Sequence, residues 1–353
     1  MYLPKTSLYI LCIFSIWRLI INIFSNFAAQ NMEKRTKIVF IVNPISGTSD
    51  KKRIIDLIPE YLDSRRFDWT ICQTEYRGHA AVLTNQACQD GADVVVAVGG
   101  DGSVIDVVSG ISGTGMTLGI VPCGSGNGLA RSLHIPMTPA LAVRLLNHYY
   151  VASIDTVSLN EYTYASIAGV GFDALVACRM KQAKTRGLQA FANIIINDYP
   201  LSQEQVFRMR IDGKEIERSA WFISLANSNQ FGFETRVAPL AKLDDGLIDV
   251  CIVGKIPLAH IPLTAPLLYL NHFQYSQHVE MFKAHEVIIY NNDMRWVNID
   301  GEGEEVGTEL HFVNNPKALK IICRDPNYKP VPRVFENLER DIERAVMENI
   351  HIS

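Results

Sequence analysis

An aspartate stands between glycines in the segment VAVGGDGSVIDVV (96–108), where Gly99, Gly100, Asp101, Gly102 and Ser103 follow a run of valines. Glycines let a backbone approach an anion closely, and the N–H groups at the start of a following helix favour phosphate. A carboxylate is out of place against bare phosphate, but it suits a bridging Mg²⁺ or an acceptor hydroxyl. The segment therefore predicts a phosphate-binding turn whose acid faces a metal ion or a hydroxyl.

Two common phosphate-binding patterns do not fit this turn. A dinucleotide fingerprint needs a third glycine where this chain has Ile105, and a Walker A loop needs Gly-Lys-Ser/Thr, which the sequence lacks. Taken alone, the segment is also compatible with a plain tight turn between a strand and a helix.

The turn has neighbours of the same character. Three other polar or glycine-rich loops follow expected strands in the same half of the chain: NPISG (43–47), TEYRGHA (74–80) and PCGSGNGLAR (122–131). In the last loop Gly124, Gly126 and Gly128 alternate with Ser125 and Asn127 at the start of a helix. Ligands of parallel α/β sheets bind beyond the carboxyl ends of the strands. Four such loops at one sheet edge predict a site for a nucleotide polyphosphate.

The elements that position these loops alternate between strand and helix. Continuous apolar runs predict strands at 37–44, 68–75, 93–99 and 117–122, and amphipathic or helix-forming segments separate them. This order predicts a parallel sheet covered by helices on both faces.

The character of the chain changes after about residue 151. Short alternating strands, Asp-Gly turns at 212–213 and 300–301, and helical patches near 174–197 and 256–272 predict a β-rich domain, either a sandwich or a flattened barrel.

Two further motifs, APLAKLDDGLIDVCIV (238–253) and NIDGE (298–302), complete a pattern. Together with the two glycine-rich motifs, they resemble the diacylglycerol kinase catalytic-domain family, which includes bacterial lipid kinases and the sphingosine and ceramide kinases. GGDG alone is unspecific, because NAD kinases and 6-phosphofructokinases share it, but four motifs in this order are specific. The resemblance covers roughly residues 36–325.

The resemblance implies a phosphofructokinase-like α/β ATP-binding domain at 36–152, a β-sandwich lipid or substrate domain at 153–325, and an active site in the cleft between them. We also expect a C-terminal helix at 326–353 that packs back on the first domain.

The resemblance also implies roles for individual residues. The nucleotide contacts would be Asn43, Ser46, Gly47, Thr74, Gly99, Gly100, Asp101, Gly102, Ser103, Gly124, Ser125, Gly126 and Asn127. The catalytic carboxylates would be Asp101, Asp155 and Glu302, with Glu302 as general base. A largely structural Mg²⁺ would bind Asp245 and the carbonyls of Lys242 and Leu247.

The chain departs from the family pattern at two places. Ile105-Asp106 stands where Asn-Glu is usual, and Gly128 stands where an aspartate is usual. The second change is closer to sphingoid and ceramide kinases. Candidate acceptor surfaces are 229–237 and the apolar stretch 256–272. Five basic residues could bind anionic lipid headgroups or form a solvated helix face. They are Arg131, Arg179, Lys181, Lys184 and Arg186.

The predicted function is an ATP- and Mg²⁺-dependent lipid kinase, cytoplasmic and peripheral at the inner membrane surface. It would phosphorylate the hydroxyl of diacylglycerol or of a sphingoid base. The alternatives are an NAD kinase-type enzyme and a non-catalytic regulator that binds nucleotide or lipid. A homodimer is left open.

Composition limits the other classes of ligand that the chain could bind. A net charge of −4 over 353 residues gives no basic excess for nucleic acid, and the seven cysteines show no zinc spacing. Residues 7–29 are apolar but carry Arg18. Three interpretations of residues 1–31 stay open: a start of translation at Met32, a membrane-associating helix, or a signal peptide.

Overall fold

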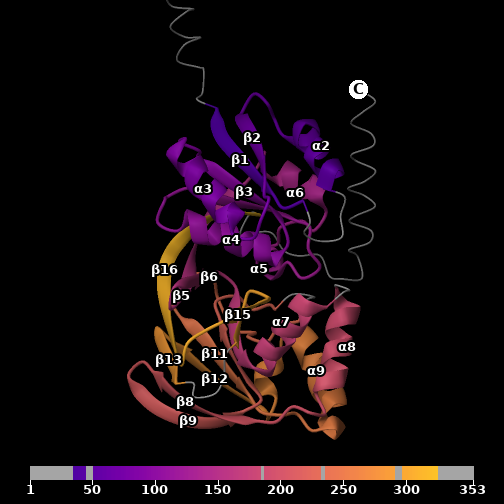
Figure 1. Cartoon of the computed structure of the whole chain (residues 1–353), viewed down its shortest axis with the longest axis vertical. Helices are drawn as coiled ribbons and strands as arrows, with labels where there is room; N and C mark the ends of the chain where they lie inside the picture. The colour runs from indigo at the N-terminus through magenta and orange to yellow at the C-terminus, as the bar shows by residue number, and fades with distance from the viewer. Residues whose placement is uncertain (1–34, 45–50, 184–186, 232–234, 291–295, 325–353) are drawn as a thin grey trace, which may run out of the picture.

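The computed structural model describes residues 35–44, 51–183, 187–231, 235–290 and 296–324, which form two lobes joined along one edge (Figure 1). The predictions for residues 1–31 and 326–353, and those for Ser46 and Gly47, lie outside the described residues.

The first lobe contains the predicted parallel sheet. Its strands lie in the order β2 (Phe67–Gln73), β1 (Thr36–Val42), β3 (Val94–Gly99) and β4 (Thr117–Pro122). Every residue of β3 is buried, which explains its unbroken run of small apolar residues. The helices are α2 (Lys51–Tyr61), α3 (His79–Gln89), α4 (Asp101–Ile111), α5 (Gly128–Ser132) and α6 (Pro139–Leu145).

The second lobe is a sandwich of two sheets. One sheet has the order β12 (Val279–Ala284), β11 (Ile248–Val253), β10 (Phe222–Ala226), β7 (Ile167–Gly171), β14 (Trp296–Ile299) and β15 (Glu302–Glu305). The other contains β16 (Glu309–Cys323), β13 (Glu286–Tyr290), β8 (Gln205–Ile211), β9 (Lys214–Ala220), β5 (Tyr150–Leu159) and β6 (Tyr162–Tyr164). Buried side chains of both sheets share one core, and this confirms the predicted sandwich.

Helical segments cover the outer side of the sandwich (Figure 1). These are α7 (Phe172–Gln182), α8 (Leu188–Asp198), α9 (Ile261–Tyr269) and the 3-10 turns η1 (Leu258–His260) and η2 (Phe273–Tyr275). Phe273 and Leu267 pack there on Cys251 and Val253 of β11. Within the described ranges, no helix is both long and apolar enough to span a bilayer.

Strand β16 links the two lobes. It pairs with β13 and β5 in the sandwich, and then Lys320 and Ile321 pair in parallel with Thr117 and Leu118 of β4 (Figure 1). The parallel sheet of the first lobe therefore continues into the sandwich. The sequence predicts short strands after residue 151 but not this crossover, because an apolar run does not specify its partner.

Candidate active site

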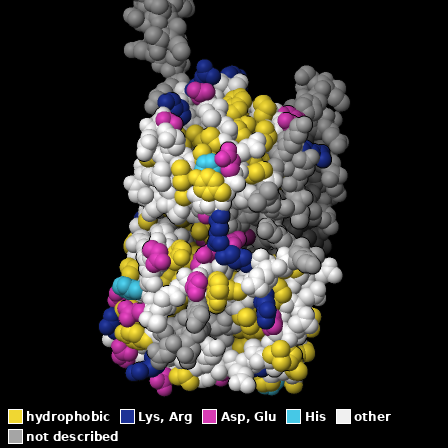
Figure 2. All heavy atoms as spheres, viewed as in Figure 1, with side chains coloured by type: hydrophobic (Ala, Val, Ile, Leu, Met, Phe, Trp, Pro, Cys, Tyr) yellow, Lys and Arg dark blue, Asp and Glu magenta, His cyan; other side chains and the backbone are white. Residues whose placement is uncertain are grey.

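A cavity of about 800 Å³ lies where the lobes meet, lined by loops of the first lobe and by the β14–β15 hairpin of the second. Figure 2 shows charged side chains of both signs gathered at this junction. Predicted site residues that line it are Asn43, Thr74, Gly100, Asp101, Gly102, Ser103, Gly124, Ser125, Gly126 and Glu302. Gly99 ends β3 beside them, and Asn127 is buried in the loop that enters α5. The glycine-rich turns thus meet at one edge, as their place after parallel strands predicts.

Two of the glycine-rich loops pack directly on each other. A Cβ on Gly124 would lie 2.7 Å from the Cα of Gly100, and a Cβ on Gly100 would lie 3.2 Å from the Cα of Gly124. The Cys123 N–H also donates to the Gly99 carbonyl at 2.7 Å. These glycines are therefore required by the contact of loop on loop, besides any ligand.

Asp101 ties the same two loops together. Its carboxylate oxygens accept the N–H groups of Asn127 at 2.7 Å and Gly128 at 2.8 Å. Burial raises the pKa of Asp101, and these backbone hydrogen bonds act in the opposite direction. A Cβ on Gly126 would lie 2.7 Å from one Asp101 oxygen, so this loop also needs a glycine there. Asp101 lines the cavity and positions the entry to α5.

The start of α4 opens onto the cavity. Gly100 is its N-cap and supplies no side-chain cap, and Ser103 in the first turn is only 6% exposed. The Ser103 hydroxyl has no hydrogen-bond partner among the described residues. A buried unpaired hydroxyl at a helix N-terminus suits an anion whose oxygens would complete its hydrogen bonds.

Glu302 approaches this helix from the other lobe. A Cβ on Gly102 would lie 2.8 Å from Glu302 Oε1, so the carboxylate rests against the first turn of α4. Glu302 begins β15 and is half-buried. An acidic side chain is favourable at this positive end of the helix dipole.

Asp300 holds the hairpin that carries Glu302. Its carboxylate accepts the N–H groups of Ser166 and Ile167 at 3.1 and 2.5 Å, and its φ of 47° forms the turn before Gly301. Burial raises the pKa of Asp300 to about 7, although the backbone hydrogen bonds oppose the shift. These contacts agree with the Asp-Gly turn expected at residues 300–301.

A second support for the hairpin was not apparent in the sequence. Asn298 accepts the Gly301 N–H at 2.8 Å and donates to Asp173 of α7 at 2.9 Å. Burial raises the pKa of Asp173 to about 6. A Cβ on Gly169 would overlap this carboxylate, at 1.8 Å, so the position must be glycine. The signal was present as an aspartate at the start of a helix, but its partner lies 125 residues away.

Charged residues join the lobes at the cavity rim. Arg77 of the first lobe forms an ion pair with Glu304 of β15, and Lys181 of α7 lies 3.7 Å from the same carboxylate. Asp106, at the departure from the family pattern, accepts the Gly78 N–H. Burial raises its pKa, while that bond and Arg77 lower it. The shorter carboxylate therefore anchors the loop at 74–80 to α4.

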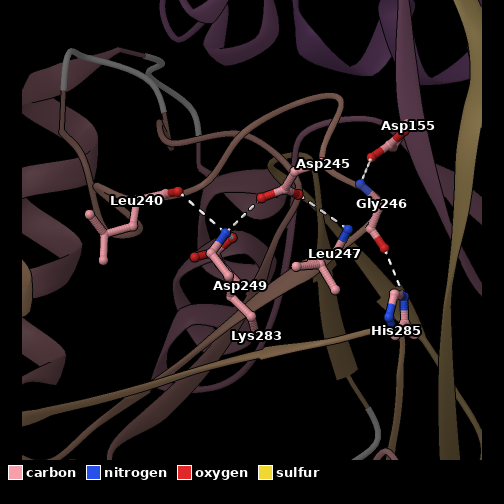
Figure 3. A network of polar contacts seen from close by, with 8 residues as sticks. All are labelled: Asp155, Leu240, Asp245, Gly246, Leu247, Asp249, Lys283 and His285. Atoms are coloured by element: carbon pink, nitrogen blue, oxygen red, sulfur yellow. Dashed lines mark hydrogen bonds and ion pairs between the residues drawn. The ribbon is translucent and has the colours of Figure 1, made fainter.

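The remaining predicted residues lie apart from the cavity lining. Asp155 is fully buried, and its oxygens accept the N–H groups of Gly246 at 2.6 Å and Lys317 at 2.7 Å. Asp245 contacts Lys283 instead of a cavity residue, and Leu247 donates its N–H to Asp245 at 3.2 Å (Figure 3). Lys242 belongs to the same loop and is exposed. The structure thus divides the predicted set into a cavity group and a loop-holding group.

Comparison with known proteins agrees with this architecture. The profile of the diacylglycerol kinase catalytic domain matches residues 37–159, and that of the YegS C-terminal NAD kinase beta sandwich-like domain matches residues 166–323. A diacylglycerol kinase of Staphylococcus aureus (strain bovine RF122 / ET3-1) is 29% identical over 302 residues, which are 83% of this chain and 93% of the relative. One from Staphylococcus saprophyticus is 28% identical over 297 residues, 82% of this chain and 95% of the relative.

Solved structures share the fold. A crystal structure described as a diacylglycerol kinase from Bacillus anthracis str. Sterne superposes with a TM-score of 0.65 at 20% identity, covering 83% of this chain and 98% of that one. Another structure from the same strain gives 0.69 at 22% identity, with 83% and 99% covered.

A parallel α/β domain with glycine-rich loops, followed by an antiparallel β-sandwich, is thus the fold that this chain shares with those structures. The chain belongs to the diacylglycerol kinase catalytic-domain family, a family of lipid kinases.

Proposed function

We propose that this protein transfers the γ-phosphoryl group of ATP to the hydroxyl of a membrane lipid, a diacylglycerol or a sphingoid base. The observation that carries the proposal is the position of Glu302, a carboxylate of the second lobe held against the N-terminus of α4 in the first. A base beside a phosphate-binding helix terminus is the arrangement that phosphoryl transfer to an alcohol requires.

The nucleotide phosphates would bind between the two glycine-rich loops. Gly100, Gly102 and Gly124 leave the backbone bare, and the Ser103 hydroxyl would gain a phosphate partner. Arg77 and Lys181 bring positive charge to the rim of the same cavity. Backbone N–H groups, a helix terminus and cations together neutralise a polyphosphate.

Glu302 would accept the proton of the lipid hydroxyl as its oxygen bonds to the γ-phosphorus and the bond from that phosphorus to the bridging oxygen of ADP breaks. Mg²⁺ carried by the nucleotide would neutralise charge on the phosphates. Asp101 and Glu302 are carboxylates that line this cavity, and carboxylate oxygens are ligands that Mg²⁺ prefers. These oxygens fit such an ion.

The lipid would approach from the apolar side of the second lobe. The stretch 256–272 forms η1 and α9, where Leu258, Leu263 and Leu270 are 68%, 76% and 63% exposed. Figure 2 shows hydrophobic side chains at the lower right, over α9. Exposed leucines in one short segment favour contact with a membrane surface, and the proposal places the protein peripherally on the inner face.

The test offers purified protein ATP, Mg²⁺ and a panel of diacylglycerol, sphinganine, ceramide and NAD. The proposal expects one of the lipids to be phosphorylated. Phosphorylation of NAD alone would instead support an NAD kinase, and ATP binding without any transfer would support a regulator.

The base is tested with Glu302→Gln, which should lower kcat by about 100-fold or more while ATP affinity stays near that of the wild type. Glu305→Gln, an exposed position on the same strand, is the matched control and should keep full activity. Substantial turnover by Glu302→Gln would assign the proton to another group.

A further inference from the structure

The loop that carries Asp245 is held by a lysine ammonium. Lys283 Nζ donates to Asp245 Oδ2 at 2.9 Å, to Asp249 Oδ2 at 2.8 Å and to the Leu240 carbonyl at 3.4 Å (Figure 3). The three oxygens come from both ends of one segment, residues 240–249. A single cation therefore draws this segment together.

Strand pairing fixes the position of the Lys283 ammonium. Lys283 of β12 lies directly opposite Asp249 of β11 in the antiparallel pair, and Asp249 is only 2% exposed. Strand pairing places this ammonium next to a buried carboxylate. It stays there because its departure would leave the Asp249 carboxylate buried without a partner.

The set of groups does not fit a divalent ion. Mg²⁺ needs six oxygen ligands at about 2.0–2.1 Å in octahedral geometry. Here Oδ2 of Asp245 and Oδ2 of Asp249 both accept hydrogen bonds from the Lys283 ammonium. The Leu247 N–H donates to Oδ1 of Asp245.

Neighbouring contacts hold the rest of the loop without a metal. The Gly246 N–H donates to Asp155, and the Gly246 carbonyl lies 3.0 Å from His285 Nδ1 (Figure 3). The Asp155 N–H donates to the Leu243 carbonyl at 2.6 Å.

We propose that the Lys283 ammonium is the resident cation of the 240–249 loop and takes the place of the structural Mg²⁺ that the family resemblance assigns to Asp245. The loop and the sandwich beneath it then fold independently of divalent ions. This inference needs no assumption about the reaction.

Thermal unfolding in EDTA and in MgCl₂, without nucleotide, tests the proposal. The wild-type Tm should be the same in both. Lys283→Met should lower the Tm by about 5–10 °C in EDTA, because it leaves the buried Asp249 unpaired. The control Lys320→Met changes an exposed lysine on β16 and should leave the Tm within about 1–2 °C.

A second measurement keeps the test decisive if Lys283→Met fails to fold. Mn²⁺ binding to the wild-type protein is compared with binding to Asp245→Asn. Equal binding, or none, supports the proposal. A wild-type Tm that rises with Mg²⁺, or a Mn²⁺ site that Asp245→Asn abolishes, would overturn it.

Discussion

Gly124→Ala probes the contact between the two glycine-rich loops. The new methyl group would lie 2.7 Å from the Gly100 Cα and 2.8 Å from Asn127 Oδ1, whereas ordinary contacts begin at 3.4 Å. The nearest obstacle is backbone and cannot rotate away. The loops must therefore separate by about 0.7 Å or more, which moves the cavity wall at Gly100–Ser103 away from the wall at Gly124–Gly126.

The size of the effect follows from this displacement. Overpacking of a tight contact costs about 1–3 kcal/mol of folding free energy, and the Tm falls by about 2–4 °C for each kcal/mol. A misplacement near 1 Å costs about 100-fold in catalysis. We therefore expect the Tm to fall by several degrees and kcat/KM to fall about 10- to 100-fold, with weaker ATP binding.

The assay compares ATP affinity, lipid phosphorylation and Tm with those of Gly307→Ala. A Cβ on Gly307 meets nothing within 4 Å and its φ is not positive, so this control should match the wild type. If Gly124→Ala bound ATP and turned over like Gly307→Ala, the apposition of Gly100 and Gly124 would not set the geometry of the site.

Three other predictions concern the carboxylates. Folded Asp300 and Asp173 have pKa values raised from 3.8 to about 7 and about 6. Between these pKa values and 3.8, the folded state therefore binds more protons than the unfolded state. As pH rises from about 4 to 7, Asp300 lowers the free energy of unfolding by about 4 kcal/mol, and as pH rises from about 4 to 6, Asp173 lowers it by about 3 kcal/mol. Asp300→Asn should flatten the pH dependence seen in urea unfolding, and an unchanged slope would refute this. Asp155→Ala leaves the Gly246 and Lys317 N–H groups unpaired and should cost about 2–5 kcal/mol of stability while the folded protein still binds ATP; calorimetric loss of ATP binding at full stability would contradict a structural part for Asp155. Asp106→Ala releases the Gly78 N–H and should raise the KM for ATP severalfold with little change in Tm; an unaltered KM would mean that the loop at 74–80 needs no such anchor.

Much of the architecture is readable from local patterns. The valine run of β3 and the glycine turn after it predict a buried parallel strand that ends at the edge where ligands bind, and the structure has the buried strand and a cavity at that edge. The alternating strands after residue 151 likewise predict the sandwich. These inferences succeed because periodicity and turn chemistry act within a few residues.

Pairings between residues far apart in the chain could not be predicted from the sequence. Nothing in ALKIICR (318–324) says that Lys320 and Ile321 join β4 of the first lobe, because strand partners are chosen by the whole fold. The pair Arg77–Glu304 and the pair Asp173–Asn298 each join residues more than 100 positions apart. Lys283 lay outside every motif and is recognised only through its register with Asp249.

The aspartates of the motifs have a shared physical feature that separates them from Glu302. Asp101, Asp106 and Asp300 line the cavity, and each accepts a backbone N–H from a different loop, so each fixes the position of that loop. A short side chain is suited to this, because it reaches the nearby backbone with few rotatable bonds. Glu302 has the longer side chain and meets the N-terminus of α4 across the lobe boundary. The motifs therefore combine two chemistries. These aspartates hold the walls of the cavity together, and the glutamate lies on the opposite wall against the first turn of α4.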